Sequence, residues 1–137
     1  MSDTIQQVGA LPYLIKNGRP RFILITPKLV SDIWIAPKGH IETDLGLQGS
    51  AEAEALEEAG VIGRADARPI GSYTYRKFNN TYEVSVYPLK VIEVLDTWDE
   101  DHVRERCIVK RKRAVELISL EPIAEMITSL AKRLKQG

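Results

Sequence analysis

The alternation of hydrophobic and polar positions divides the first part of the chain into short strands. Val8–Lys16 and Arg21–Thr26 are both rich in apolar residues, and Asn17-Gly18 between them is typical of a two-residue hairpin turn. Residues 22–25 are apolar at every position, which predicts a strand that is covered on both faces. Ile33–Ala36 predicts one more short buried strand.

The second half of the chain predicts three further strands and two helices. The strands are Pro69–Phe78, Thr81–Leu95 and Arg104–Val109, and the turn between the first two lies at Asn79-Asn80. Lys112–Ile118 favours a short helix. After Pro122 the apolar residues recur with helical spacing, which predicts a terminal amphipathic helix with proline in its first turn.

One further helix, predicted over Gln48–Ala59, carries an unusual charge pattern. Glu54, Glu57 and Glu58 are spaced i, i+3, i+4 and share one helix face, where like charges cost about 0.2–0.5 kcal/mol per pair. Two of them lie in the last turn, where the helix dipole favours cations. A divalent cation in front of this face would reverse the sign of both effects, and the alternative is a solvated acidic face. Gly60 follows as the expected left-handed C-cap.

These elements predict an α/β fold. Strands around a helix that bears glutamates, with another helix packed at the C-terminal end, form an α/β/α sandwich on a mixed β-sheet. The chain has 137 residues, of which 44% are hydrophobic, and this suits a single domain, 1–137, with one core.

Charge and cysteine content narrow the function classes. The formal net charge is zero, so no overall field attracts nucleic acid or a membrane surface. The single cysteine, Cys107, excludes an internal disulfide framework and favours a reducing compartment. The first ten residues do not form a secretory signal, and no apolar run approaches the ~20 residues of a membrane span. We therefore expect a cytoplasmic protein.

The stretch from Gly39 to Val61 resembles the signature of the Nudix hydrolases. That pattern is Gly, five residues, Glu, seven residues, Arg-Glu, an apolar residue, any residue, Glu-Glu, any residue, Gly and an apolar residue. The matching residues are Gly39, Glu54, Ala55, Glu57, Glu58, Gly60 and Val61, all in register. Two positions depart from the pattern, because Leu45 stands in place of the first Glu and Ala53 in place of the Arg.

The resemblance implies a metal-dependent cleavage of a phosphoanhydride. Glu54, Glu57 and Glu58 would hold Mg²⁺ or Mn²⁺ and act as the catalytic residues, with Glu54 a candidate base for the attacking water. In the family the arginine orients these carboxylates. With Ala53 in its place, either another cation takes over the task, with Lys38, Arg76 and Lys77 as candidates, or the site is looser.

A second segment resembles the diphosphoinositol polyphosphate phosphohydrolase branch of the family. It consists of Val91–Trp98 followed by Glu100, Arg104 and Arg106, and Gly71–Lys77 is similar to that branch as well. The resemblance implies a small phosphoanhydride substrate, either a dinucleoside polyphosphate or a diphosphoinositol polyphosphate.

Four residues are candidates for contacting such a substrate. Lys38 would meet a phosphate or is simply solvated, and Gly39 brings its loop near the metal site or is only a turn glycine. Arg104 and Arg106 would receive phosphates or pair with Asp99 and Glu100. Glu100 itself is either an additional ligand or base, or part of an acidic surface loop.

The leading hypothesis is therefore an enzyme, a Mg²⁺-dependent pyrophosphohydrolase. The alternative is a Nudix-fold module that binds nucleotides or polyphosphates and has weak or no turnover, which Leu45 and Ala53 favour. A third interpretation, an RNA-end hydrolase, rests on the basic run Lys110–Arg113, which a solvated helix face also explains. We expect no membrane partner and no nucleic acid partner, and the sequence leaves a homodimer open.

Overall fold

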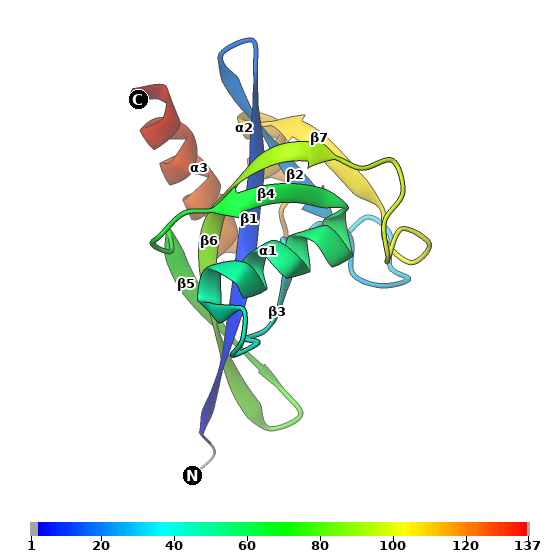
Figure 1. Ribbon diagram of the computed structural model, residues 1–137, viewed down its shortest axis with the longest axis vertical. Coiled ribbons are helices and arrows are strands. Elements are labelled where there is room, and N and C mark those ends of the chain that lie inside the picture. Colours follow the sequence, from blue (N-terminus) through cyan, green and yellow to red (C-terminus); the bar gives the residue numbers. More distant parts are fainter. Residues whose placement is uncertain (1–2, 137) are drawn as a thin grey trace.

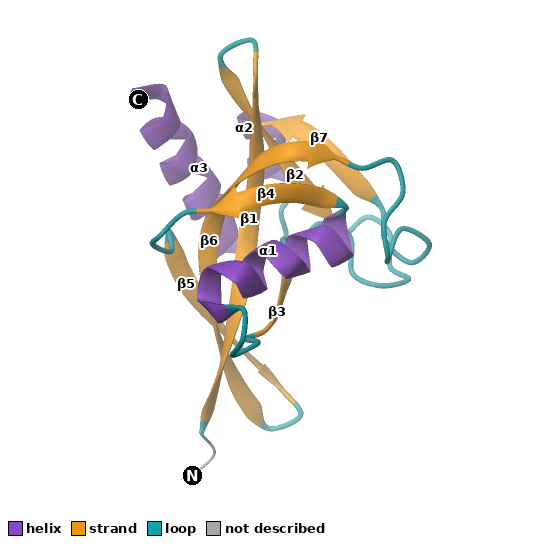
Figure 2. Ribbon diagram, viewed as in Figure 1, coloured by secondary structure: helices purple, strands orange, loops and turns teal. Residues whose placement is uncertain are grey.

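The computed structural model describes residues 3–136, which form seven strands and three helices (Figures 1 and 2). The strands are β1 (Thr4–Lys16), β2 (Arg19–Ile25), β3 (Lys38–His40), β4 (Val61–Ala65), β5 (Gly71–Lys77), β6 (Asn80–Val94) and β7 (Arg106–Lys110). The helices are α1 (Gly46–Ala59), α2 (Arg111–Leu117) and α3 (Glu121–Gln136). Within the described residues, no helix is long and apolar enough to cross a membrane.

The strands form one mixed sheet in the order β4-β6-β1-β2-β7, with β3 paired to β1 and β5 paired to β6. The pairing of β1 with β6 is parallel, whereas the other strand pairs are antiparallel. Helix α1 lies across one face of the sheet, and α2 and α3 cover the opposite face (Figure 1). This arrangement confirms the predicted α/β/α sandwich around a mixed sheet.

The core is divided between the two faces of the sheet. Phe22 and Leu24 of β2 pack with α3, whereas Ile23 and Ile25 pack with α1, and all four side chains are fully buried. The continuous apolar run in the sequence is thus explained by a strand with a hydrophobic layer on each side.

Helix α1 approaches the sheet closely because its inner face carries only small side chains. Ala51, Ala55 and Ala59 recur every fourth residue and are completely buried against the sheet. The helix ends at Gly60, which adopts the left-handed conformation expected of a C-cap, with φ +67°. The spacing of the alanines therefore determines which face of α1 packs on the sheet. The glutamates lie beside this face, where they can line a cavity.

Three local predictions differ from the structure. Ile33–Ala36 forms only isolated bridges, and the regular strand in this region is β3, directly after it. The sequence does not predict strand β4. This strand pairs with the part of β6 that lies beyond the pairing of β6 with β5. The turn between β5 and β6 lies at Phe78-Asn79, where both residues have positive φ, one residue earlier than predicted.

Candidate active site

The glutamates of α1 line a cavity of about 420 Å³ beside the sheet. Glu54, Glu57 and Glu58 form one wall, as their spacing on the helix predicts. The other walls come from β1, β3 with the residues after it, and the β5–β6 hairpin: Gln7, Lys38, Gly39, His40, Glu42, Tyr75, Lys77 and Tyr82. The structure therefore brings together the three predicted carboxylates and two of the four predicted substrate contacts, Lys38 and Gly39.

Gly39 lies directly against the carboxyl group of Glu54. It sits in β3, opposite Val8 of β1, so its backbone is held by the sheet. A Cβ atom at this position would overlap the Glu54 carboxyl carbon and both of its oxygens. An alanine at position 39 would displace the flexible end of the Glu54 side chain, so this glycine allows the close approach of the helix carboxylate and lies in a strand, not in a turn.

Crowding of the carboxyl groups raises their pKa values. Burial, followed by the neighbouring charge of Glu58, raises the pKa of Glu54 to about 8. Burial also raises the pKa of Glu58, although Arg104 and the backbone N–H of Lys38 act in the opposite direction. Glu57 is largely exposed, and its pKa is raised by partial burial and then by Glu100 and Asp99. The burial and the neighbouring carboxylates oppose negative charge at all three residues, and a bound cation would offset both effects.

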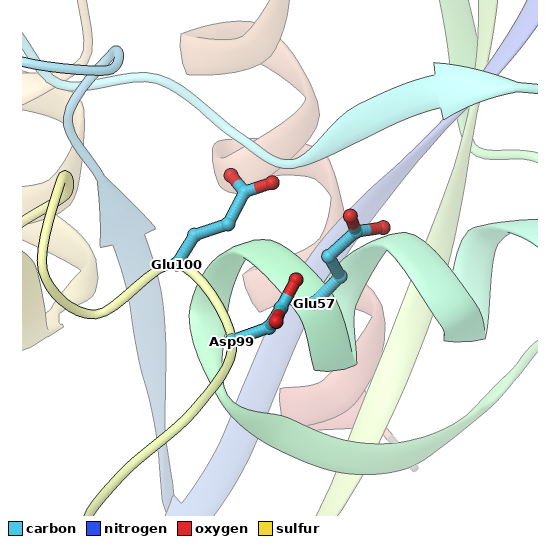
Figure 3. Close-up of side chains that lie close together, drawn as sticks. All are labelled: Glu57, Asp99 and Glu100. Carbon is cyan, nitrogen blue, oxygen red and sulfur yellow. The ribbon is translucent and has the colours of Figure 1, made fainter.

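Glu57 also belongs to a second group of carboxylates, which it forms with two residues of the loop between β6 and β7. Oxygen atoms of Glu57, Asp99 and Glu100 all lie within 4.8 Å of one another (Figure 3). Carboxylate oxygens are the ligands that Mg²⁺ and Mn²⁺ prefer, and a helix together with a docked loop can hold them in place. The donor set therefore fits a divalent cation. Sequence reasoning identified Glu100 as a candidate ligand but did not identify Asp99.

The loop that carries Asp99 and Glu100 is bound to the C-terminal end of α1. The last carbonyl groups of a helix have no partner within it. Here the backbone N–H of Glu100 donates to the carbonyl of Glu57, at 3.2 Å, and Trp98 Nε1 donates to the carbonyl of Glu58, at 3.0 Å. Arg106 Nη1 donates to the carbonyl of Ala59, at 2.9 Å. The loop thus completes the helix and is placed by it.

Arg106 is part of this contact between loop and helix. Its guanidinium lies 4.1 Å from the centre of the Trp98 ring, and its positive charge sits at the helix end that the dipole makes negative. Arg104 is also turned toward α1 and forms an ion pair with Glu58. Neither arginine lines the cavity with the glutamates. The expectation that they bind substrate phosphates stays a prediction, and both have protein partners in this structure.

The opposite wall of the cavity is a polar and aromatic network. Lys38 Nζ donates to the hydroxyl oxygen of Tyr75 at 3.0 Å, and this hydroxyl donates to Gln7 Oε1 at 2.7 Å. The rings of Tyr75 and Tyr82 are stacked, with centroids 4.8 Å apart. These tyrosines face each other across the hairpin, because they are register partners in β5 and β6. Tyrosine is also common in β-strands for reasons of packing, so the sequence alone does not reveal this aromatic surface.

Relatives identify the family to which this architecture belongs. The chain is 30% identical, over 137 residues, to Nudix hydrolase 18, mitochondrial, of Arabidopsis thaliana, and the match covers 94% of this chain and 77% of that protein. The chain belongs to the Nudix hydrolase family. Nudix hydrolases act on phosphoanhydrides, generally with a divalent metal, and this chain is accordingly a hydrolase of phosphorus-containing anhydrides. The comparison with family models gave no match.

Two other comparisons agree with the Nudix assignment. The chain is 32% identical over 78 residues to diphosphoinositol polyphosphate phosphohydrolase 3-beta of Bos taurus, covering 57% of this chain and 46% of that protein. The crystal structure of a C. elegans Ap4A hydrolase binary complex has a TM-score of 0.80 at 15% identity, covering 98% of this chain and 100% of that one. The latter match shows that the two proteins share the Nudix fold.

The raised pKa of Glu54 predicts how the stability of the metal-free protein depends on pH. In the folded protein, burial and then the neighbouring carboxylates Glu58, Glu57 and Glu100 raise the pKa of this carboxyl group from the ordinary 4.5 to about 8. The folded state therefore binds the proton more tightly than the unfolded chain. The free energy of unfolding should fall as the pH rises between these two values. Melting temperatures measured in a chelator from pH 5 to pH 8 would show this decline.

Glu54→Gln should flatten that decline, because the amide does not titrate. The matched control is Glu125→Gln, which removes an exposed carboxylate from α3 on the far side of the sheet. A Glu54→Gln variant whose melting temperature depends on pH as steeply as that of the parent would show that Glu54 is not a source of the decline.

Proposed function

We propose that this protein is a Mg²⁺- or Mn²⁺-dependent pyrophosphohydrolase that cleaves a phosphoanhydride bond in a nucleoside diphosphate linked to another group. The observation that carries the proposal is the meeting of Glu54, Glu57 and Glu58 in one cavity, with Asp99 and Glu100 docked beside Glu57. Such a concentration of carboxylates is destabilising where they are ionised, and a bound cation would relieve the repulsion. A divalent ion with a polyphosphate substrate would do so.

In this proposal the carboxylates serve metal binding and proton transfer. The bound metal would neutralise charge on the phosphates and make its bound water a stronger acid. Glu57, Asp99 and Glu100 would supply oxygen ligands, and Glu54 and Glu58 line the cavity together with Glu57. Glu54 is the candidate base, because it stands at the cavity wall where it can take a proton from an attacking water.

The wall opposite the glutamates is suited to the rest of the substrate. Lys38 and Lys77 bring positive charge to the cavity, where it can meet phosphate groups. The stacked rings of Tyr75 and Tyr82 provide a flat apolar surface beside them. Together with the names of the similar proteins, this supports a dinucleoside polyphosphate or a diphosphoinositol polyphosphate as the substrate. The aromatic surface favours the first, since a nucleobase can stack on it.

The alternative is a binding module with weak or no turnover, and the two departures from the signature are its support. Leu45 is the N-cap of α1, which places it about 18 Å along the helix axis from Glu57 at 1.5 Å per residue. A leucine there removes no oxygen from the carboxylate group around Glu57. Ala53 is the more serious departure, because it lies next to Glu54. The enzyme interpretation is favoured because a module without turnover does not need this group of carboxylates.

An RNA substrate has less support. Lys110, Arg111 and Lys112 line a different cavity, of about 390 Å³, together with Arg19 and Lys135. None of the three glutamates lines that cavity. The basic run therefore stands apart from the proposed chemistry. The cytoplasmic location and the homodimer considered from the sequence stay predictions.

A hydrolysis screen tests the proposal. Dinucleoside polyphosphates, nucleotide sugars, nucleoside triphosphates and diphosphoinositol polyphosphates would each be incubated with the protein, with Mg²⁺, with Mn²⁺ and with a chelator. We expect hydrolysis of at least one dinucleoside polyphosphate or diphosphoinositol polyphosphate only when metal is present. Tight binding of these compounds without turnover under every metal condition would favour the binding module.

A further inference from the structure

Arg104 connects the two groups of carboxylates. Its Nε donates to Glu100 Oε1 at 2.7 Å, and its Nη2 lies 3.5 Å from Glu58 Oε2. The remaining nitrogen, Nη1, donates to the carbonyl of Thr26 at 2.9 Å. The arginine side chain is only 9% exposed, and the side chains of Glu58 and Glu100 are each 12% exposed. One buried guanidinium therefore holds a helix carboxylate and a loop carboxylate at the same time.

The guanidinium is also held by the segment that directly follows β2. Thr26 follows β2 and is completely buried, and its hydroxyl accepts the backbone N–H of Glu105 at 2.8 Å. The backbone groups of Thr26 and Glu105 are bonded as well, at 3.1 Å. A planar guanidinium with three separate partners cannot rotate without breaking one of them. Arg104 is thus a rigid link between the sheet, the helix and the loop.

The three cations that the sequence suggests for orienting the carboxylates have other partners. Lys38 Nζ is bonded to Tyr75, and Arg76 Nη1 donates to Thr81 Oγ1 at 3.1 Å. Lys77 Nζ lies over the ring of Phe78. Among the described residues, Arg104 is the cationic side chain that forms an ion pair with Glu58. Lys38 contacts Glu58 through its backbone N–H, which donates to the other carboxylate oxygen at 3.2 Å.

We propose that Arg104 is the positioning residue of the metal site and performs from the loop the task for which the signature uses an arginine at position 53. This inference rests on the proposed function, because it assumes that the carboxylates hold a metal. Arg104 fixes Glu58 and Glu100 by one oxygen each, and it ties the loop with Asp99 and Glu100 to the helix with Glu57. The site is consequently rigid although position 53 is alanine.

The test compares Mn²⁺ binding in Arg104→Gln, Arg104→Lys and the parent. Mn²⁺ affinity would be measured from the electron paramagnetic resonance signal of the free ion, at a temperature where each variant is folded. Loss of a residue that orients ligands typically weakens metal affinity about 10–100-fold, and we expect that loss in Arg104→Gln. Arg104→Lys should recover part of it, because an ammonium can contact one carboxylate but not hold both in a planar fork.

Arg133→Gln is the matched control. This exposed arginine pairs with Asp66 on the surface at 3.6 Å, so its removal breaks an arginine–carboxylate contact far from the site. We expect its Mn²⁺ affinity to equal that of the parent. If Arg104→Gln does not fold, Arg104→Lys decides, since a lysine that leaves Mn²⁺ affinity unchanged would overturn the proposal.

Other roles for Arg104 predict different results. If Arg104 were purely structural, Arg104→Gln would lower the melting temperature and leave the Mn²⁺ affinity of the folded protein unchanged. If Arg104 bound substrate, Arg104→Gln would raise KM at saturating Mn²⁺, again with unchanged Mn²⁺ affinity. Either result would overturn the proposal while the parent still binds Mn²⁺ and hydrolyses its substrate. A parent that binds no Mn²⁺ would instead refute the proposed function, and the role of Arg104 with it.

Ala53→Arg provides an independent test in the parent background. If Arg104 already holds the carboxylates, a second arginine on α1 should leave Mn²⁺ affinity within about twofold of the parent, far less than the about 10–100-fold effect of an orienting residue. A tenfold tighter affinity would show that the natural site is loose and that Arg104 does not perform the task.

Discussion

Glu57→Gln is expected to reduce kcat for metal-dependent hydrolysis by on the order of 1000-fold, because a metal ion stabilises the transition-state charge by several kcal/mol and each 1.36 kcal/mol is tenfold in rate. Glu57 is the residue that lines the cavity and also belongs to the carboxylate group with Asp99 and Glu100. Its replacement by an uncharged amide removes a ligand and leaves the shape of the site unchanged. The measurement is kcat at saturating Mg²⁺ on the best substrate found in the screen.

The same variant should fold normally. Glu57 is exposed, and its carboxylate faces Asp99 and Glu100, so the amide relieves repulsion. Its metal-free melting temperature should be no lower than that of the parent, and Glu125→Gln should leave both stability and kcat unchanged. Near-normal turnover of Glu57→Gln would remove Glu57 from the set of ligands. A large loss of metal-free stability would make it a structural residue.

Gly39→Ala is expected to reduce kcat by about 100-fold, the effect of moving a catalytic group by about 1 Å. The added Cβ would overlap the Glu54 carboxyl group, and β3 cannot retreat because it is paired with β1. The Glu54 side chain must therefore leave its position at the cavity wall. The measurement is kcat and KM for the same substrate, with a thermal melt to establish that the variant is folded.

Gly49→Ala is the matched control for this glycine. It lies in α1 on the same helix as Glu54, and a Cβ there would meet only the side chain of Leu45, at 3.1 Å. We expect it to keep the activity of the parent. Parental activity in Gly39→Ala would show that the close approach to Glu54 has no role in the reaction.

The sequence was sufficient to predict the fold and the glutamate wall of the site. Residues 22–25 reveal a strand covered on both faces, and the spacing of Glu54, Glu57 and Glu58 places them on one side of α1. Both inferences depend on periodicity within one element, which local sequence determines directly. The left-handed cap at Gly60 could be predicted because glycine favours this conformation directly after a helix.

The remainder of the site depends on contacts between distant segments. Asp99 joins Glu57 only because the loop donates hydrogen bonds to the end of α1, and nothing in the composition of the loop shows where it docks. The stacking of Tyr75 on Tyr82 depends on the register of the β5–β6 hairpin, and the turn predicted from the sequence is one residue away from the observed turn. These features require the tertiary structure.

The role of the two arginines illustrates the same limit. The sequence left open whether Arg104 and Arg106 receive phosphates or pair with acidic residues, and in the structure both turn toward the end of α1. The sequence of this segment alone does not distinguish a phosphate from a helix terminus as the partner. In the structure, the tryptophan, glutamate and two arginines of this segment all contact the last residues of α1.

The most direct test of the central claim is hydrolysis of a dinucleoside tetraphosphate in ¹⁸O-labelled water while Mg²⁺ is titrated, with the parent and Glu57→Gln side by side. The account predicts that the parent forms a nucleotide product with one labelled oxygen on phosphorus, at a rate that rises with Mg²⁺ and saturates. Glu57→Gln should form almost none. Labelled product at the same rate without metal, or in Glu57→Gln, would contradict the assignment of the reaction to this carboxylate site.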